Sequence, residues 1–113
     1  MRRCPPRGVL RPRDRLESAD EADLRKWALA DGWEVIKVGR EGWPDRVFIK
    51  GGLHVWIELK RASGGRRAVL QERRIKSLRD HGARAFFQDG RNAGWACLQA
   101  EWARHVESLT GDL

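Results

Sequence analysis

Two strands joined by a pair of glycines decide the fold, in the stretch Asp45-Arg-Val-Phe-Ile-Lys50-Gly-Gly-Leu53-His-Val-Trp-Ile-Glu58-Leu-Lys60. Alternate side chains of a strand point to opposite faces of its sheet. Val55, Ile57 and Leu59 are therefore expected to face a core, while Glu58 and Lys60 share the other face. The two glycines predict a hairpin turn between the strands.

Helical spacing and capping residues predict the elements on either side of this hairpin. Ser18 and Glu21 form a capping-box signature that opens a helix, and Gly82 closes a later one. The expected elements are helices at 18–30, 68–81 and 94–109 and strands at 33–38, 45–49, 53–60 and 83–88. This order predicts an α/β fold with an α-β-β-β-α-β core, a mixed sheet flanked by helices, and a C-terminal helix. If the last two strands pair in parallel, they form a right-handed β-α-β unit.

The length of 113 residues suits one domain with one core. Residues 1–16 are rich in arginine and proline and predict a flexible basic arm, so the domain is placed at 17–113. Cys4 and Cys97 form neither a disulfide framework nor a zinc pattern. No apolar run is long enough for a membrane span, and no secretory signal is recognisable. A cytoplasmic protein is expected, with most of its six tryptophans in the core.

The net charge of +7 is concentrated in two segments. Residues 1–16 hold six arginines against one aspartate, and residues 60–79 hold eight basic residues against one glutamate. A basic cluster beside a strand that carries Glu58 is typical of a protein that binds a phosphate backbone, although a solubilising surface is the alternative. The candidate DNA-binding residues are Arg61, Arg66, Arg67, Arg73 and Arg74.

Asp45, Glu58 and Lys60 have the residue types that a metal-dependent phosphodiesterase needs. Carboxylate oxygens are the hard ligands that Mg²⁺ prefers. Lys60 has two roles open to it: as a base it must be partly neutral, and as a cation it stabilises the charge that develops on the phosphate. The alternative for the pattern as a whole is an exposed strand edge with a solvated glutamate–lysine pair.

Two polar residues lie on otherwise apolar helical stripes. Gln71 shares a stripe with Ile75 and Leu78, where its amide can orient a water or Lys60 at the edge of a site. It is otherwise a polar residue at the margin of the stripe. Glu21 of the first predicted helix likewise lies on an apolar stripe. It either contributes to the site or serves as a helix cap.

These motifs together resemble the PD-(D/E)xK nuclease superfamily and, within it, the VRR-NUC family of small nuclease domains. Pro44-Asp45 is similar to the family's first motif, and Glu58-Leu59-Lys60 is similar to its Glu-x-Lys motif. The segment that begins at Gln71 is similar to its glutamine helix, and the segment around Glu21 to its opening acidic helix. The match runs from about residue 18 to residue 87. It leaves out the N-terminal arm and is weak after residue 90.

The resemblance implies a restriction-endonuclease-like fold and a structure-selective DNA endonuclease of repair or recombination. The implied cofactor is Mg²⁺, with Mn²⁺ as a substitute, and the implied metal ligands are Glu21, Asp45, Glu58 and the backbone carbonyl of Leu59. The implied catalytic residues are Asp45, Glu58, Lys60 and Gln71. Branched DNA, as a Holliday-like junction or a flap, is the implied substrate, cut by a homodimer.

Two other functions fit the same sequence. A non-catalytic nucleic-acid binding module with a vestigial site needs only the basic segments, and the intact Asp45, Glu58, Lys60 and Gln71 set argues against it. A basic toxin or inhibitor would use the same charge on a protein partner, which no motif favours.

Overall fold

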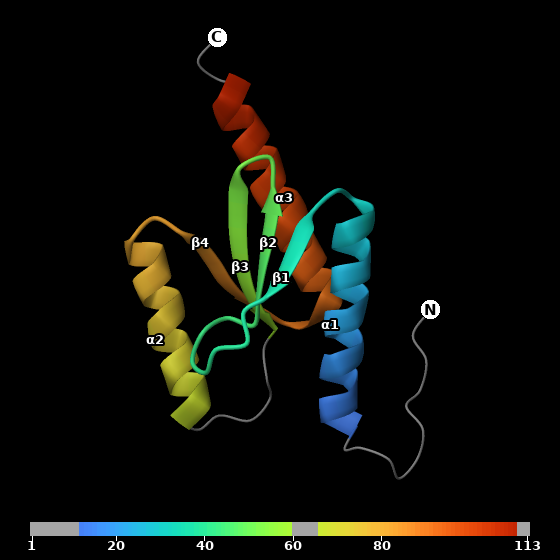
Figure 1. Cartoon of the computed structure of the whole chain (residues 1–113), viewed down its shortest axis with the longest axis vertical. Coiled ribbons are helices and arrows are strands. Elements are labelled where there is room, and N and C mark those ends of the chain that lie inside the picture. Colours follow the sequence, from blue (N-terminus) through green and yellow to red (C-terminus); the bar gives the residue numbers. More distant parts are fainter. Residues whose placement is uncertain (1–11, 60–65, 111–113) are drawn as a thin grey trace.

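The structure is a computed structural model that describes residues 12–59 and 66–110, with side chains over 19–59 and 69–110. The elements along the chain are α1 (Pro12–Ala30), β1 (Glu34–Lys37), β2 (Arg46–Lys50), β3 (Leu53–Leu59), α2 (Arg66–Asp80), β4 (Arg84–Gln88) and α3 (Gly90–Thr110) (Figure 1). The predicted α/β class and the predicted order of helices and strands are confirmed.

The four strands form one mixed sheet in the order β1-β2-β3-β4. β1 pairs with β2 and β2 with β3 in antiparallel fashion, whereas β3 and β4 are parallel. α2 connects the parallel strands, so the predicted crossover is confirmed. Gly51 and Gly52 make the predicted hairpin turn with φ angles of 53° and 86°, which glycine adopts without the steric cost that a Cβ brings.

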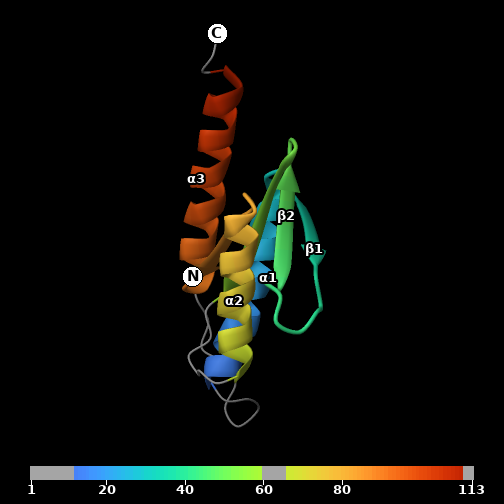
Figure 2. The same ribbon diagram turned by 90° about the vertical axis from the view of Figure 1, so that its left-hand side faces the viewer.

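Helices α1 and α3 cover one face of the sheet, where the core lies. Val55, Ile57 and Leu59 pack into this core, as predicted from strand alternation. The core residues are Leu24, Ala28, Trp33, Phe48, Leu53, Val55, Ile57, Leu59 and Leu98. α3 runs along the sheet, and its C-terminal end extends past the strands (Figure 2).

The opposite face of the sheet is covered by α2 and by the segment 39–44 between β1 and β2. Trp56 of β3 points to this face, and its ring centroid is 5.7 Å from that of Trp43. Arg74 of α2 lies over the Trp43 ring at 4.2 Å. Glu58 points to the same face as Trp56, so the covered region includes a predicted site residue.

All three helices begin earlier than the sequence predicts, and α2 does so by two residues, at Arg66. α1 begins at Pro12, six residues before Ser18, so the predicted capping box is wrong. Proline suits the first turn of a helix because its missing N–H would have no partner there, and a Ser-x-x-Glu pattern is also compatible with a helix interior. α1 thus includes residues 12–16 of the predicted arm, while 1–11 lie outside the described residues. α3 begins at Gly90 instead of residue 94.

Close contact between α1 and α3 depends on one small residue. A Cβ added at Gly94 of α3 would stand 2.7 Å from Cδ2 of Leu24. Two tryptophan pairs flank the contact: Trp27 with Trp95, and Trp33 with Trp102, each edge-on with centroids 6.2 Å apart. Trp33 is buried and the other three are half-buried, so the predicted core role holds for this group.

Cys97 is a free, half-buried thiol in α3. Burial, together with the negative charge of Glu101, raises its pKa to about 11, so it stays protonated at neutral pH and is a poor nucleophile. Cys4 lies outside the described residues. Within the described ranges, no helix combines the length and the apolar character that crossing a bilayer requires.

Candidate functional site

Asp45 is fixed by hydrogen bonds to strands on both of its sides. In the β2–β3 register Arg46 is opposite Ile57, so one step outward Asp45 is opposite Glu58. The Asp45 N–H donates to Oε1 of Glu58 at 2.8 Å. The Asp45 carbonyl accepts a hydrogen bond from the Val38 N–H, also at 2.8 Å. The two predicted acids are therefore neighbours, held by backbone groups.

The backbone conformation of the segment before Asp45 is restricted. Pro44 is fully buried, and a proline restricts the preceding residue, Trp43, to extended geometry. The Trp43 N–H donates to the Arg40 carbonyl at 3.1 Å, and Gly42 has a φ of 83°. This tight turn positions Asp45 directly before β2, which begins at Arg46, close to the strand start that the Pro-Asp pattern predicts.

Glu58 is buried, with 2% of its surface exposed. The alternative of a solvated strand-edge glutamate is therefore wrong. A carboxylate in such a place requires polar partners, because burying an uncompensated charge is costly. The backbone N–H of Asp45 is one such partner, and it fixes the direction in which the carboxylate points.

Glu21 of α1 and Asp45 line the same small pocket. Its empty space is about 240 Å³, including space open to solvent. The lining residues are Glu21, Leu24, Asp45, Arg46, Phe48, Ile57 and Leu59. Glu21 lies in the third turn of α1, so the helix-cap interpretation is wrong for this residue. The structure thus gathers Glu21, Asp45 and Leu59 around one pocket, beside Glu58.

Arg46 is a pocket residue that the sequence reasoning missed. Its Nε atom is 3.6 Å from Oδ2 of Asp45, and the two side chains are 19% and 21% exposed. This buried Nε has no hydrogen-bond partner among the described residues. A signal existed in the sequence, because strand alternation places this arginine on the same face as Ile57 and the core. A cation here can attract an anionic group to the pocket.

The predicted metal ligands offer oxygen atoms only, as carboxylates of Glu21, Asp45 and Glu58 and the backbone carbonyl of Leu59. Asp45, Leu59 and Glu21 line the pocket, whereas Glu58 does not and contacts the backbone of Asp45. Over 12–59 and 66–110, no group of three or more His, Cys, Asp or Glu side chains is placed to hold a metal ion. Two carboxylates completed by a carbonyl and by waters are a common arrangement for Mg²⁺, so the chemistry of the donors fits this ion.

Gln71 is buried, although it is polar. It is 4% exposed on α2, one helical turn from Ile75, which is 5% exposed. The predicted stripe is therefore a buried face of α2, and the margin interpretation is wrong. Lys60 and Arg61 lie outside the described residues, as do the side chains of Arg66 and Arg67.

Arg73 and Arg74 line a groove between α2 and the segment 39–44. Its empty space is about 620 Å³ and is open to solvent. The lining residues are Glu41, Gly42, Leu70, Arg73, Arg74 and Ser77, and this set is called the cationic groove below. Arg73 is exposed, whereas Arg74 is half-buried over Trp43. Both predicted DNA-binding residues with described side chains thus share one concave surface.

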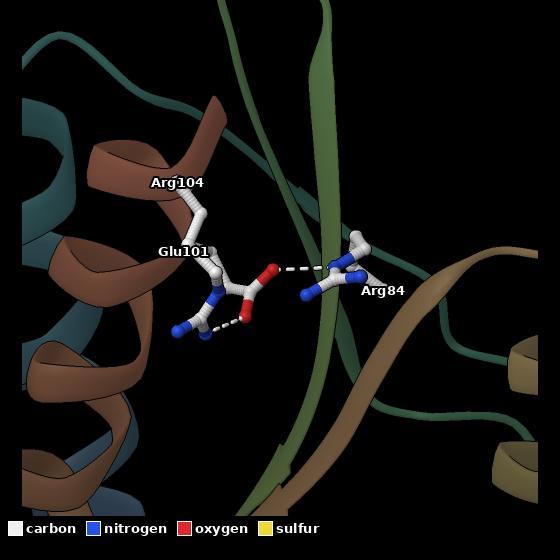
Figure 3. Close-up of polar contacts among 3 residues, drawn as sticks. All are labelled: Arg84, Glu101 and Arg104. Carbon is white, nitrogen blue, oxygen red and sulfur yellow. Dashed lines mark hydrogen bonds and ion pairs between the residues drawn. The ribbon is translucent and has the colours of Figure 1, made fainter. Parts of the chain in front are cut away.

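A second polar cluster joins α3 to β4, and the sequence reasoning missed it. Figure 3 shows Glu101 between Arg84 and Arg104. Arg84 Nε donates to Oε1 of Glu101 at 2.5 Å, and Arg104 donates to Oε2. Glu101 is 2% exposed. It lies one turn from Leu98 on an apolar stripe, the same signal that singled out Gln71.

Opposing effects set the pKa of the Glu101 carboxyl. Burial acts to raise it, but hydrogen bonds from Arg84 and Arg104 outweigh burial and lower the pKa below its usual range. The same hydrogen bond raises the pKa of the Arg84 guanidinium. The cluster is therefore a charged group at neutral pH, and it is distant in sequence from the Asp45–Glu58 pair.

The fold and the pocket define an α/β protein whose mixed sheet carries two neighbouring acids at the ends of β2 and β3. Comparison with known proteins adds no relative: no family model, no curated protein and no solved structure matches this chain. The VRR-NUC resemblance therefore stays a prediction from the sequence motifs.

Proposed function

We propose that the protein is a Mg²⁺-dependent endonuclease that hydrolyses phosphodiester bonds in branched DNA. One observation carries the proposal: the buried Glu58 carboxylate is hydrogen-bonded to Asp45 N–H at 2.8 Å. The pair lies beside a pocket that is lined by Glu21, Asp45 and Arg46. Two acids at adjacent strand ends, with a cation next to them, suit the chemistry of a phosphodiester.

In this proposal Asp45, Glu58 and the Leu59 carbonyl hold the Mg²⁺ ion, with Glu21 joining directly or through water. When bound, the ion lowers the pKa of a coordinated water and offsets negative charge on the phosphate. The hydrogen bond between Asp45 N–H and Glu58 keeps the carboxylate oriented before any ligand arrives. Such preorganisation reduces the rearrangement that binding requires.

Arg46, Lys60 and Gln71 have supporting roles in the proposal. The Arg46 guanidinium beside Asp45 attracts a phosphate and balances its charge. Lys60, the next residue after β3 ends at Leu59, acts as a base or as a stabilising cation. The Gln71 amide, buried in α2, orients a water or Lys60. Arg73 and Arg74 contact the DNA in the cationic groove.

Cleavage of defined DNA substrates tests the proposal. Branched, linear and single-stranded DNA are incubated with Mg²⁺, with Mn²⁺ or with chelator, using wild type, Asp45→Asn and Lys60→Ala. We expect metal-dependent cleavage of branched DNA. Both substitutions should slow this cleavage by more than about 100-fold. Mutating a residue that only supports a metal ligand already lowers metal affinity or activity by about 10- to 100-fold.

Glu34→Gln is the matched control, because Glu34 is an exposed carboxylate on the edge strand β1. It should leave the cleavage rate within about twofold of wild type. DNA binding without metal-dependent cleavage, unchanged by Asp45→Asn, would contradict the proposal and favour the non-catalytic binding module.

A further inference from the structure

The cationic groove combines an apolar surface with two guanidinium groups. Leu70 lines the groove and is 37% exposed. Arg73 and Arg74 lie on the same wall, and Ser77 adds a hydroxyl. Apolar surface, positive charge and a hydrogen-bonding group are what a nucleotide needs from its site, since it carries a flat base and an anionic phosphate.

Trp43 supports one of these guanidinium groups from behind. Arg74 lies 4.2 Å from the Trp43 centroid and also lines the groove. Arg40 lies over the same ring at 5.6 Å. Trp56 supports Trp43 in turn, with a centroid distance of 5.7 Å and a tilt of 43°. The stack holds Arg74 in a fixed orientation, which makes it a platform for a base.

The positive charge in this cluster is crowded. Both Arg40 and Arg74 lie over the Trp43 ring, so their guanidinium carbons are within about 10 Å of each other. That is about one Debye length at 0.1 M salt, so the direct repulsion between the two charges is weak. Arg40 and Arg74 together add positive charge around Trp43, which favours an anion in the neighbouring groove.

The concave shape of the groove selects an unpaired strand. A convex helix or ribbon of a protein enters the grooves of a duplex, whereas the cationic groove is a hollow open to solvent, a shape that suits a single strand. Glu41 on the rim repels phosphates from its side and directs the strand along α2. Gly42 lines the groove and Asp45 lines the pocket of the proposed active site, and the two residues are three positions apart in the chain.

We propose that the cationic groove binds an unpaired nucleotide of the DNA substrate, with the base stacked on Arg74 and the phosphate bound by Arg73. This inference rests on the proposed function for the identity of the substrate. It narrows that substrate to branched DNA with an unpaired segment next to the cut, such as a flap, in preference to a fully paired four-way junction.

Binding in chelator tests the inference without any need for cleavage. The fluorescence anisotropy of a labelled oligothymidylate is compared with that of an abasic strand of equal length and of a duplex. Wild type should bind oligothymidylate about tenfold more tightly than the abasic strand, because stacking on a flat platform requires a base. It should also prefer oligothymidylate to the duplex.

Arg74→Lys is the discriminating variant, because lysine keeps the charge but lacks the flat guanidinium. It should weaken oligothymidylate binding several-fold and leave abasic-strand binding unchanged. Arg25→Lys, the same exchange at an exposed position of α1 outside the groove, is the matched control and should change neither by more than about twofold. Arg73→Ala should reduce the slope of log affinity against log salt by about 0.7, as expected for one lost phosphate contact. Arg25→Ala, an equal loss of charge on exposed α1, should leave that slope unchanged.

Three results would overturn the inference. They are equal wild-type affinity for oligothymidylate and the abasic strand, equal weakening of both by Arg74→Lys, and duplex binding as tight as single-strand binding. Tight single-strand binding by a protein that never cuts DNA would leave the inference standing and contradict the nuclease proposal. Failure of the groove inference can therefore be distinguished from failure of the nuclease proposal.

Discussion

At the scale of single residues, Glu101 shows how one buried carboxylate connects two elements. It accepts hydrogen bonds from Arg84 of β4 and Arg104 of its own helix. The two arginines are 47% and 62% exposed, so their guanidinium groups stay partly hydrated while the carboxylate is buried. Such an arrangement limits the desolvation penalty to one partner, which favours a net stabilising interaction.

Replacing Glu101 tests that interaction. Glu101→Gln should lower the free energy of unfolding at pH 7 by about 1 to 3 kcal/mol, because it removes hydrogen bonds to charged donors. Urea unfolding followed by circular dichroism measures the change. Glu107→Gln, at an exposed position of the same helix, is the control and should cost less than about 0.5 kcal/mol.

The Glu101 cluster also predicts a dependence on pH. The pKa of Glu101 is lowered in the folded protein, so its stabilising effect is fully present above its ordinary value of 4.5 and disappears as the pH falls through the folded-state pKa. The difference in unfolding free energy between wild type and Glu101→Gln should therefore shrink below pH 4.5. A difference that stays constant from pH 7 to pH 3 would contradict this account.

At the scale of elements, the contact between α1 and α3 depends on Gly94. Alanine is a better helix former by about 1 kcal/mol, but its Cβ would stand 2.7 Å from Leu24 and 3.5 Å from Leu59, both in the core. We expect the clash to prevail, since overpacking costs about 1 to 3 kcal/mol. Gly94→Ala should therefore destabilise the protein in urea unfolding.

The double variant Gly94→Ala with Leu24→Ala supplies the control. Removing the leucine side chain makes room for the new methyl group, so the two effects should be less than additive. Stabilisation by Gly94→Ala alone, of the size that helix propensity predicts, would show that α1 and α3 are further apart than the structure places them.

The strands and their faces follow from the sequence more reliably than the helix ends do. The Gly51-Gly52 turn and the alternation in β3 set the register that brings Asp45 next to Glu58. The start of α1 was predicted wrongly because Ser18 and Glu21 fit a capping box and a helix interior equally well. A local pattern of this kind cannot distinguish the start of a helix from its interior.

The missed site residues depend on contacts between distant elements. Arg46 becomes significant only because α1 closes a pocket over the start of β2. Glu101 becomes significant only because Arg84 of β4 lies beside it. A residue-by-residue reading of the sequence finds the acids at strand ends, and it finds their cationic neighbours only when the packing of the helices is known.

At the scale of the whole molecule, the proposed nuclease offers one Asp45–Glu58 pair per chain. Two symmetric cuts in a four-way junction would require two such sites and hence a homodimer with a twofold axis, whereas a single cut at a flap requires one site. Sedimentation over a wide range of concentration measures this. A protein that stays monomeric at high concentration would contradict paired cutting and would restrict the activity to single cuts, as at a flap.

All six tryptophans are arranged in three contacting pairs. Trp27–Trp95 joins α3 to α1, and Trp33–Trp102 joins α3 to the residue directly before β1. Trp43–Trp56 lies beside the cationic groove. The tryptophan fluorescence and near-ultraviolet circular dichroism of this protein therefore come from two separate regions, the α1–α3 contact and the surroundings of the groove. Replacing Trp43 and Trp56 with phenylalanine leaves an optical signal that reports on helix docking alone. Replacing the other four leaves a signal that reports on the groove.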